Sequence, residues 1–186
     1  MNNPGYITIK KHADCMHRVM NHTSKCSNVH GHAYLYELTF KFTQLADLGY
    51  AMDFSELKRV GVQWIEDKLD HGAILNPHDG ILIDACTALN SKLWLMSLNG
   101  KGEYCNPSVE NIVKEMFLAQ DVLWEKRPEV SIHAIRVYET PNCFTDCTID
   151  TISTRERDHF YNMNYDLIES YAKEKSVVIY DDRCIK

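Results

Sequence analysis

The sequence has no long apolar run, no strong excess of one charge and no paired-cysteine motif. None of its apolar runs approaches the roughly 18 residues that a transmembrane helix needs, so we expect no contact with a membrane. The first residues form neither a basic nor an apolar segment, which predicts no signal peptide and a cytoplasmic protein. A net charge of −6 excludes a general nucleic-acid binder, because neutralising phosphates requires clustered Lys and Arg.

Cysteine usage and length exclude two further classes of protein. The seven cysteines are odd in number and form no CxxC pair, which indicates free thiols in a reducing compartment. A zinc ribbon and a disulfide scaffold are therefore not expected. The chain has 186 residues, of which 45% are hydrophobic and 25% charged, as in one globular domain that needs no covalent cross-link to fold.

Hydrophobic periodicity predicts an α+β fold. Alternation over 32–42 is typical of a strand with one buried face, and spacing by three and four after Asp53 or Ser55 predicts a helix to about residue 69. The other predicted strands cover 5–14, 93–96, 130–139 and 143–152, and the other predicted helices cover 81–89, the residues after Ser108, and 155–174. The predicted strands form one hairpin near each end of the chain, and predicted helices lie between the two hairpins. This order predicts an antiparallel sheet with helices on one face. Its exposed edges favour oligomerisation.

The histidines provide the first candidate site. His30 and His32 lie two residues apart, so on a strand their side chains share one face, and Gly31 between them permits close approach. His17 lies near the end of the strand region that would pair with this one. Three neutral imidazoles with an open fourth position are typical of a catalytic zinc site. The alternative is that the HxH pair arose by chance and that His17 is a surface residue.

Three other features could carry chemistry. Cys26 lies in a polar loop beside Lys25. It could be a metal ligand, a base or nucleophile, or a thiol without a function. The pair Asp70-His71 could act as a carboxylate that orients an imidazole, or His71 could simply stabilise a helix C-terminus. Glu139, at the end of a strand, could anchor a cationic or amidine-like ligand edge, or be an exposed charge.

Six motifs then occur in the order and spacing of one known family. They are HR at 17–18, KCSNVHGHAY at 25–34, MDFSELK at 52–58, LDHGAILNP at 69–77, PSVENI at 107–112 and YETP at 138–141. Over about residues 6–147 the chain resembles the 6-pyruvoyl-tetrahydropterin synthase family. Within the family it most resembles the carboxypterin synthases of queuosine and 7-deazaguanine synthesis.

The resemblance implies the tunnelling fold. This is a four-stranded antiparallel sheet with two helices on one face, assembled through the sheet edges into a barrel as a homo-oligomer, usually a hexamer. It implies one catalytic domain over 1–152, with an insert at about 78–106. Residues 153–186 are then a C-terminal extension, which we expect to be part-helical.

The resemblance also implies a metal and a nucleophile or base. His17, His30 and His32 match the family's zinc ligands, and Cys26 matches its catalytic cysteine. The sequence departs from the family at Cys15-Met16, where a pair of small residues usually precedes the first zinc histidine.

The remaining expected site residues fall in three of the motifs. Asp70 and His71 match the family's catalytic Asp-His pair, and Glu139 matches the carboxylate that grips the pterin ring. Glu110 and Thr140 lie in the PSVENI and YETP motifs, so we expect them to contact the substrate.

The implied substrate is a small molecule, 7,8-dihydroneopterin triphosphate. The carboxypterin branch converts it to 6-carboxy-5,6,7,8-tetrahydropterin and releases acetaldehyde and triphosphate. The three-residue gap between Cys26 and His30 favours this branch over the pyruvoyl branch, whose animal members have a longer gap. Two alternatives remain: a zinc-stabilised protein without activity on the same fold, and an unrelated zinc hydrolase. The second would be expected to carry an HExxH pair, which the sequence lacks.

Overall fold

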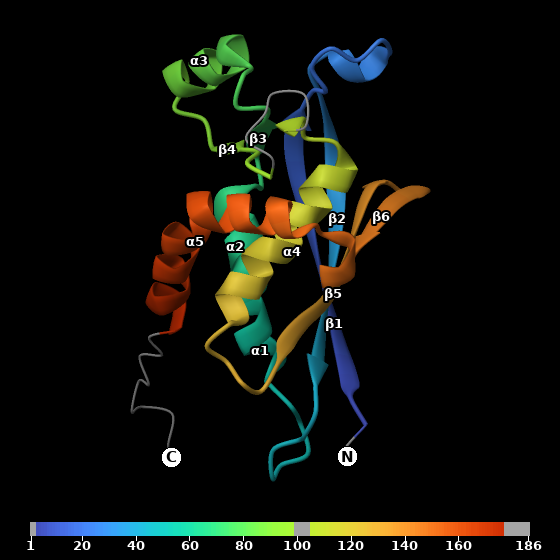
Figure 1. Cartoon of the computed structure of the whole chain (residues 1–186), viewed down its shortest axis with the longest axis vertical. Helices are drawn as coiled ribbons and strands as arrows, with labels where there is room; N and C mark the ends of the chain where they lie inside the picture. Colours follow the sequence, from blue (N-terminus) through green and yellow to red (C-terminus); the bar gives the residue numbers. More distant parts are fainter. Residues whose placement is uncertain (1–2, 99–104, 177–186) are drawn as a thin grey trace.

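The computed structural model describes residues 3–98 and 105–176 (Figure 1). None of the described helices combines the length and apolar character of a membrane span. Parts of the expected insert (99–104) and of the expected extension (177–186) lie outside the described residues. The elements in chain order are β1 (Gly5–His17), η1 (Lys25–Ser27), β2 (His30–Phe42), α1 (Phe54–Leu57), η2 (Lys58–Val62), α2 (Gln63–Lys68), β3 (Gly72–Leu75), α3 (Gly80–Ala88), β4 (Leu93–Leu95), α4 (Val109–Trp124), β5 (Ser131–Thr140), β6 (Cys143–Cys147), η4 (Ile149–Thr151) and α5 (Thr154–Ser176).

The sheet has six strands in the order β4-β3-β1-β2-β5-β6. The α+β class is confirmed, and β1, β2, β5 and β6 pair antiparallel, in two hairpins joined between β2 and β5. The expectation of a four-stranded, purely antiparallel sheet is wrong, because β3 and β4 extend the sheet in parallel. The reason lies in β1, which runs three residues beyond its predicted end. In these last residues of β1, Cys15 and Met16 pair with Gly72 and Ala73 of β3.

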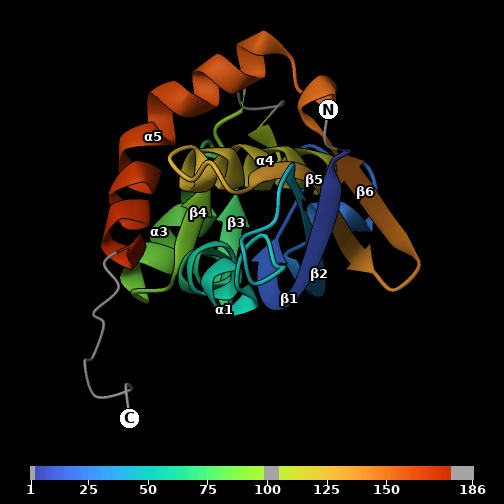
Figure 2. The same cartoon turned by 90° about the horizontal axis from the view of Figure 1, so that it is seen from below.

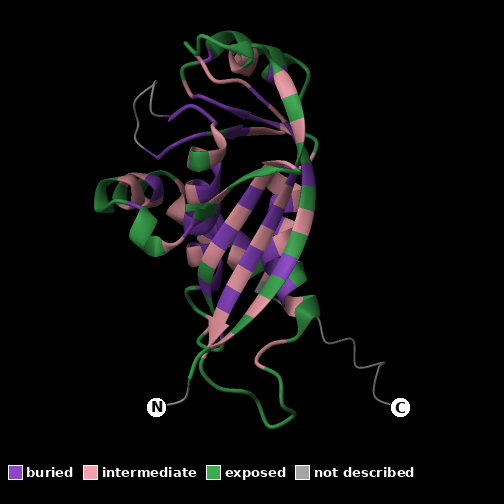
Figure 3. Ribbon diagram, turned by 90° about the vertical axis from the view of Figure 1, so that its right-hand side faces the viewer, coloured by how far each residue is buried: buried purple, intermediate pink, exposed green. Residues whose placement is uncertain are grey.

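One face of the antiparallel strands forms the core. On β2 the alternate residues Tyr34, Tyr36, Leu38 and Phe40 are fully buried, while the residues between them are partly exposed. They pack within the same apolar cluster as residues of α2 and α4. Figure 3 shows the strands from another side, where buried and partly exposed residues alternate along each of them. The period-two prediction for 32–42 is therefore confirmed.

The helix predicted from residue 53 or 55 to about residue 69 is confirmed, with one irregularity. Asp53 caps it by accepting a hydrogen bond from the Ser55 amide at 2.7 Å. The five residues of η2 form a π turn between α1 and α2. Here the carbonyl of Gly61 accepts a 3.1 Å hydrogen bond from the Gln120 side chain of α4. A Cβ on Gly61 would lie 2.7 Å from Gln120 Oε1, so any other residue here would force the Gln120 side chain to shift.

The helix predicted over 155–174 is confirmed as α5, which lies as an outer layer over α4 (Figure 2). Phe160 and Ile168 are fully buried in the core. Near its C-terminal end, the Tyr171 hydroxyl donates to the Asp67 carboxylate of α2 at 2.7 Å. The helix α5 therefore contributes to the core and also connects α4 with α2.

The buried carboxyl group of Glu115 joins the residues after β4 to α4. One of its oxygens accepts from the Trp94 indole at 2.7 Å. The other accepts from the Ser97 hydroxyl at 3.2 Å, from the Leu98 amide at 3.0 Å, and from the Ser97 amide. Burial raises the pKa of Glu115 to about 7, although these four donors oppose the shift.

We expect Glu115 to make folding stability fall as pH rises from about 4.5 to about 7. In that window the unfolded state loses its proton while the folded state keeps it, so the free energy of unfolding falls by about 3 kcal/mol. Urea unfolding across this range should show the slope in the wild type and not in Glu115→Gln. The exposed Glu129 gives the charge-matched control, Glu129→Gln, which should keep the slope. If the free energy of unfolding changed with pH in the same way in the wild type and in Glu115→Gln, Glu115 would not be the group responsible.

Candidate metal and substrate site

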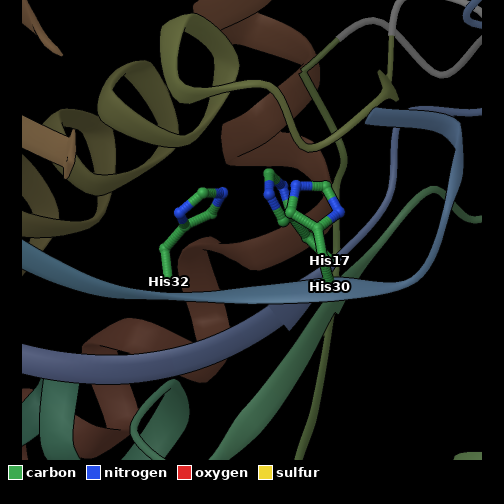
Figure 4. A group of neighbouring side chains, drawn as sticks. All are labelled: His17, His30 and His32. Carbon is green, nitrogen blue, oxygen red and sulfur yellow. The ribbon is translucent and has the colours of Figure 1, made fainter. Parts of the chain in front are cut away.

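Three imidazoles meet where β1 ends and β2 begins (Figure 4). His17 lies directly opposite His30 in the antiparallel register, and His32 lies two residues further along β2 on the same face. One ring nitrogen from each of the three lies within 4.8 Å of the others. The structure therefore brings together the three histidines singled out in the sequence, and this group could hold a metal ion.

The close approach of the two strands depends on Gly31. A Cβ at this position would lie 3.2 Å from the Cys15 carbonyl oxygen, closer than most such contacts in proteins. Glycine at this point lets the backbones of β1 and β2 pair through to their ends. The two histidines that flank it can then project side by side.

Hydrogen bonds fix the orientation of two of the rings. The Nδ1 atom of His17 donates to the Pro107 carbonyl at 2.7 Å, and Nδ1 of His30 donates to the Asn28 carbonyl at 2.8 Å. A carbonyl only accepts, so the proton of each neutral ring sits on Nδ1 and the lone pair on Nε2. This is the second contact that metal-binding histidines ordinarily make.

The electrostatics favour the neutral imidazole at His17 and at His32. His17 is only 1% exposed, and burial lowers its pKa to about 4, helped by the neighbouring His30 and His32. Burial also lowers the pKa of His32, which Glu139 opposes and Lys25 reinforces. Neutral nitrogen donors in a tetrahedral site with an open position are what catalytic zinc requires. The donor set therefore fits a zinc ion held by these three residues.

Two further side chains line the imidazole group. The Tyr34 hydroxyl, fully buried beneath it, lies 3.3 Å from both ring nitrogens of His17. Glu139, at the end of β5, places Oε1 3.7 Å from Nε2 of His17 and 3.7 Å from Nε2 of His32. These carboxylate contacts exceed hydrogen-bond length, so Glu139 is free to accept hydrogen bonds from a ligand beside the histidines.

The loop that carries Cys26 folds back onto the end of β1. Cys26 is half-buried in η1, which Ser24 caps. Its backbone carbonyl accepts from the Val19 amide at 2.8 Å, two residues beyond His17. The positive charge of Lys25 is close enough to His32 to lower the pKa of its imidazole. The thiol therefore belongs to the same end of the sheet as the imidazoles.

Asp70 and His71 form a pair, but their surroundings differ from those of the imidazoles. The Asp70 carboxylate accepts from the Asp14 amide at 2.8 Å and from Nδ1 of His71 at 2.9 Å. Burial opposes ionisation of Asp70, yet these two hydrogen bonds lower its pKa below the usual value. The His71 side chain is 78% exposed.

His71 lines a shallow hollow on the other face of the sheet. The strand residues that line it are Asp14, Cys15, Met16, Gly31, His32 and Ala33. Of these, Asp14, Gly31 and Ala33 have the parity opposite to that of His17 on β1 and of the two histidines on β2, so their side chains face away from the imidazole group, and His32 borders the hollow from its own position on β2. Within the described chain, the Asp70-His71 pair and the three imidazoles thus belong to different faces.

The other two expected substrate residues occupy different environments. Thr140 is half-buried and follows Glu139 at the end of β5. Glu110 is exposed in the first turn of α4, three residues after Pro107, whose carbonyl orients His17. Both lie on segments that border the imidazole group.

Comparison with known proteins identifies the family. A sequence model of the family described as 6-pyruvoyl tetrahydropterin synthase matches residues 6–150, which is most of the chain. This chain belongs to that family. It is 31% identical over 137 residues to 6-carboxy-5,6,7,8-tetrahydropterin synthase of Rickettsia felis, covering 72% of this chain and 92% of the relative. The protein of the same name from Haemophilus influenzae is 28% identical over 141 residues, covering 72% and 91%.

Solved structures of the family share the fold. The 6-pyruvoyl tetrahydropterin synthase of Caenorhabditis elegans superposes with a TM-score of 0.54 at 16% identity, covering 79% of this chain and 96% of the other. The family match ends at residue 150, shortly before α5 begins at Thr154. The helix that covers α4 thus lies beyond the matched region.

Sequence reasoning missed Tyr34 and Pro107 as neighbours of His17. Tyr34 could have been found, because it continues the parity of His30 and His32 on the same strand. Pro107 could not, because its contact is made by a backbone carbonyl 90 residues away from His17.

We expect the wild-type chain to bind one divalent ion and His17→Ala to weaken that binding by at least about 100-fold. The physical reason is that His17 supplies one of three nitrogen donors and removing it leaves an incomplete site. Competition against a chromophoric chelator measures the affinity. His12, exposed on the same strand, supplies the matched control His12→Ala, which should bind as the wild type does. Equal affinities for the two variants would contradict the metal assignment.

Proposed function

We propose that the protein is a zinc-dependent lyase that converts 7,8-dihydroneopterin triphosphate and one molecule of water to 6-carboxy-5,6,7,8-tetrahydropterin, with release of acetaldehyde and triphosphate. The relatives that support this product are the carboxypterin synthases named above. The three-residue gap between Cys26 and His30 agrees with that branch. The product would feed 7-deazaguanine synthesis, and the enzyme would work in the cytoplasm, where its thiols stay reduced.

One juxtaposition carries the proposal: Glu139 lies beside two of the three imidazoles, those of His17 and His32. A pterin ring presents adjacent N–H groups, which a carboxylate can accept in a two-point, charge-assisted contact. The substrate's side chain carries vicinal hydroxyls. With the ring on Glu139, this side chain would extend toward His17 and His32. The geometry thus suits a ligand with an N–H edge at one end and hydroxyls at the other.

The chain's own residues would then supply the proton transfers. A bound zinc ion would act as a Lewis acid toward the side-chain hydroxyls and lower their pKa. Cys26, as thiolate, would remove a proton from a side-chain carbon, and His71 would donate or accept the proton on the other side. Asp70 would hold the imidazole of His71 in one tautomer through its 2.9 Å hydrogen bond.

The position of His71 implies that a complete site needs a second subunit. Asp70 and His71 face away from the imidazoles of their own chain, as described above. Assembly through sheet edges, usual for the family, would bring the open face of one subunit against the site of another. We therefore propose a homo-oligomer in which His71 serves the imidazole group of a neighbouring subunit.

The proposed reaction is tested by product analysis. The zinc-loaded protein is incubated with 7,8-dihydroneopterin triphosphate, pterins are identified by mass spectrometry, and acetaldehyde is trapped as a hydrazone. The proposal expects acetaldehyde and carboxytetrahydropterin in equal amounts. Pyruvoyltetrahydropterin without aldehyde would place the chain in the pyruvoyl branch. Unchanged substrate would favour a zinc-stabilised protein without activity.

Cys26→Ala should lower turnover by about 10²–10⁴-fold while leaving metal content unchanged, since it removes a proton-transfer group and no metal ligand. Steady-state kinetics and metal analysis of the same preparation measure both quantities. Cys143→Ala, at an exposed cysteine on β6, is the matched control and should behave as the wild type. Loss of metal from Cys26→Ala would show that the thiol is a ligand.

Mixing two inactive variants should restore activity if the site is shared between subunits. Cys26→Ala and His71→Ala are each expected to be inactive as homo-oligomers. Co-refolded together, some sites would combine an intact Cys26 from one chain with an intact His71 from its neighbour. At equal amounts, up to about a quarter of wild-type turnover is expected for randomly paired chains. A mixture that stays inactive, with mixed oligomers shown by native mass spectrometry, would contradict the shared site.

A further inference from the structure

The segment that follows His17 is clamped by the side chain of Asn106. The Met20 amide donates to Asn106 Oδ1 at 3.0 Å, and Asn106 Nδ2 donates to the Met20 carbonyl at 3.0 Å. The side-chain amide of Asn106 thus imitates a strand partner and satisfies both backbone groups of one residue. Asn106 is 9% exposed, so water competes little for these hydrogen bonds.

Further hydrogen bonds hold Asn106 itself in place. Its Oδ1 also accepts from the Asn76 side chain at 2.9 Å, just after β3. Its backbone carbonyl accepts from the Ser108 amide at 2.8 Å and from the Asn111 side chain at 2.9 Å. Both of these partners lie at the start of α4. The clamp is therefore fixed to the sheet on one side and to a helix on the other.

Asn106 precedes the residue whose carbonyl orients His17. Pro107 accepts from His17 Nδ1 at 2.7 Å. Asn106 therefore acts on His17 in two ways. Its side chain holds Met20, three positions after His17, and its backbone holds Pro107, which accepts the hydrogen bond of the His17 ring. Between these points, Arg18 makes a two-point ion pair with buried Asp79, one arm of it at 2.6 Å.

We propose that Asn106 is a positioning residue for the metal site, holding the His17 imidazole at the angle in which its Nε2 faces the other two histidines. The proposal rests on the three-histidine metal site of the proposed function and not on the reaction product. Asn106 touches neither metal nor substrate in this account, so it acts only through His17 and Pro107.

The chemistry of the clamp defines the informative substitutions. The role requires a donor and an acceptor in one planar group, which only an amide of this length offers here. Asn106→Leu keeps the approximate shape and removes both functions. Asn106→Asp keeps the acceptor for the Met20 amide and places a second oxygen against the Met20 carbonyl, so the donated hydrogen bond is lost.

Gln120 provides a matched control for a merely structural effect. It is a fully buried amide that also donates to a backbone carbonyl, that of Gly61, and accepts from a side chain, the Trp124 indole, at 3.0 Å. It lies near the C-terminal end of α4, where its side chain contacts Gly61 of η2. Gln120→Met removes a comparable buried amide, so it should lower the thermal midpoint as Asn106→Leu does without altering the metal site.

The test is Co²⁺ binding by the full chain, followed by visible absorption and by competition with a chromophoric chelator. Asn106→Leu should bind Co²⁺ at least about tenfold more weakly than the wild type, with an altered d–d spectrum, as for other residues that orient metal ligands. Gln120→Met should keep wild-type affinity within about twofold and an unchanged spectrum. Should Asn106→Leu fail to fold, Asn106→Asp is measured in the same way, with the same tenfold loss expected.

Wild-type affinity and spectrum in a folded Asn106 variant would overturn the inference, as would an equal loss in Gln120→Met. A wild-type chain that binds no Co²⁺ would overturn both the inference and the metal site. Cobalt binding that responds to Asn106 in a chain that does not turn over the pterin would support the inference and contradict the proposed reaction alone.

Discussion

The pairing of His17 with His30 is the constraint on which the rest of the site depends. In an antiparallel ladder, side chains alternate between faces, so a slip of one residue would turn one strand's histidines to the opposite face of the sheet. The register is held by the buried face of β2, where Tyr34 and Tyr36 must point into the core. Core burial thus fixes the register, and the register places three imidazoles together.

The parallel strands β3 and β4, the segment after β4 and the helix α5 support this arrangement. The strands β3 and β4 continue the sheet beyond the last residues of β1. The segment after β4 is anchored to α4 by the Glu115 carboxyl group, and the Asn164 side chain of α5 donates to the Ser97 hydroxyl at 2.8 Å. The result is a continuous set of contacts from α5 through the segment after β4 and the strands β4 and β3 to the end of β1, where the candidate site lies.

Much of the fold could be predicted from local patterns, because period-two and helical spacings record which face is buried. That holds for β2, for α4 and for α5. The parallel strands β3 and β4 could not be joined to the sheet from sequence, because their pairing depends on tertiary contacts. The end of β1 was missed for the same reason: residues 15–17 are strand because they pair with 30–32.

The candidate site was predictable where residue type and spacing coincide, as in His30 and His32. The opposite orientation of His71 was not, because nothing in Asp70-His71 shows which face of a sheet it will occupy. Backbone φ of +58° at His71 and its amide contact with Asp14 decide that orientation. Positioning contacts such as that of Asn106 also escape sequence reasoning, since they join residues about 86 positions apart.

The central claim is that three imidazoles, without the thiol, form the protein's metal site. Zinc K-edge X-ray absorption of the zinc-loaded full chain tests it most directly. The account predicts a first shell of nitrogen and oxygen donors at about 2.0–2.1 Å, with imidazole scattering for three rings. A sulfur ligand at about 2.3 Å, or fewer than three imidazoles, would contradict it.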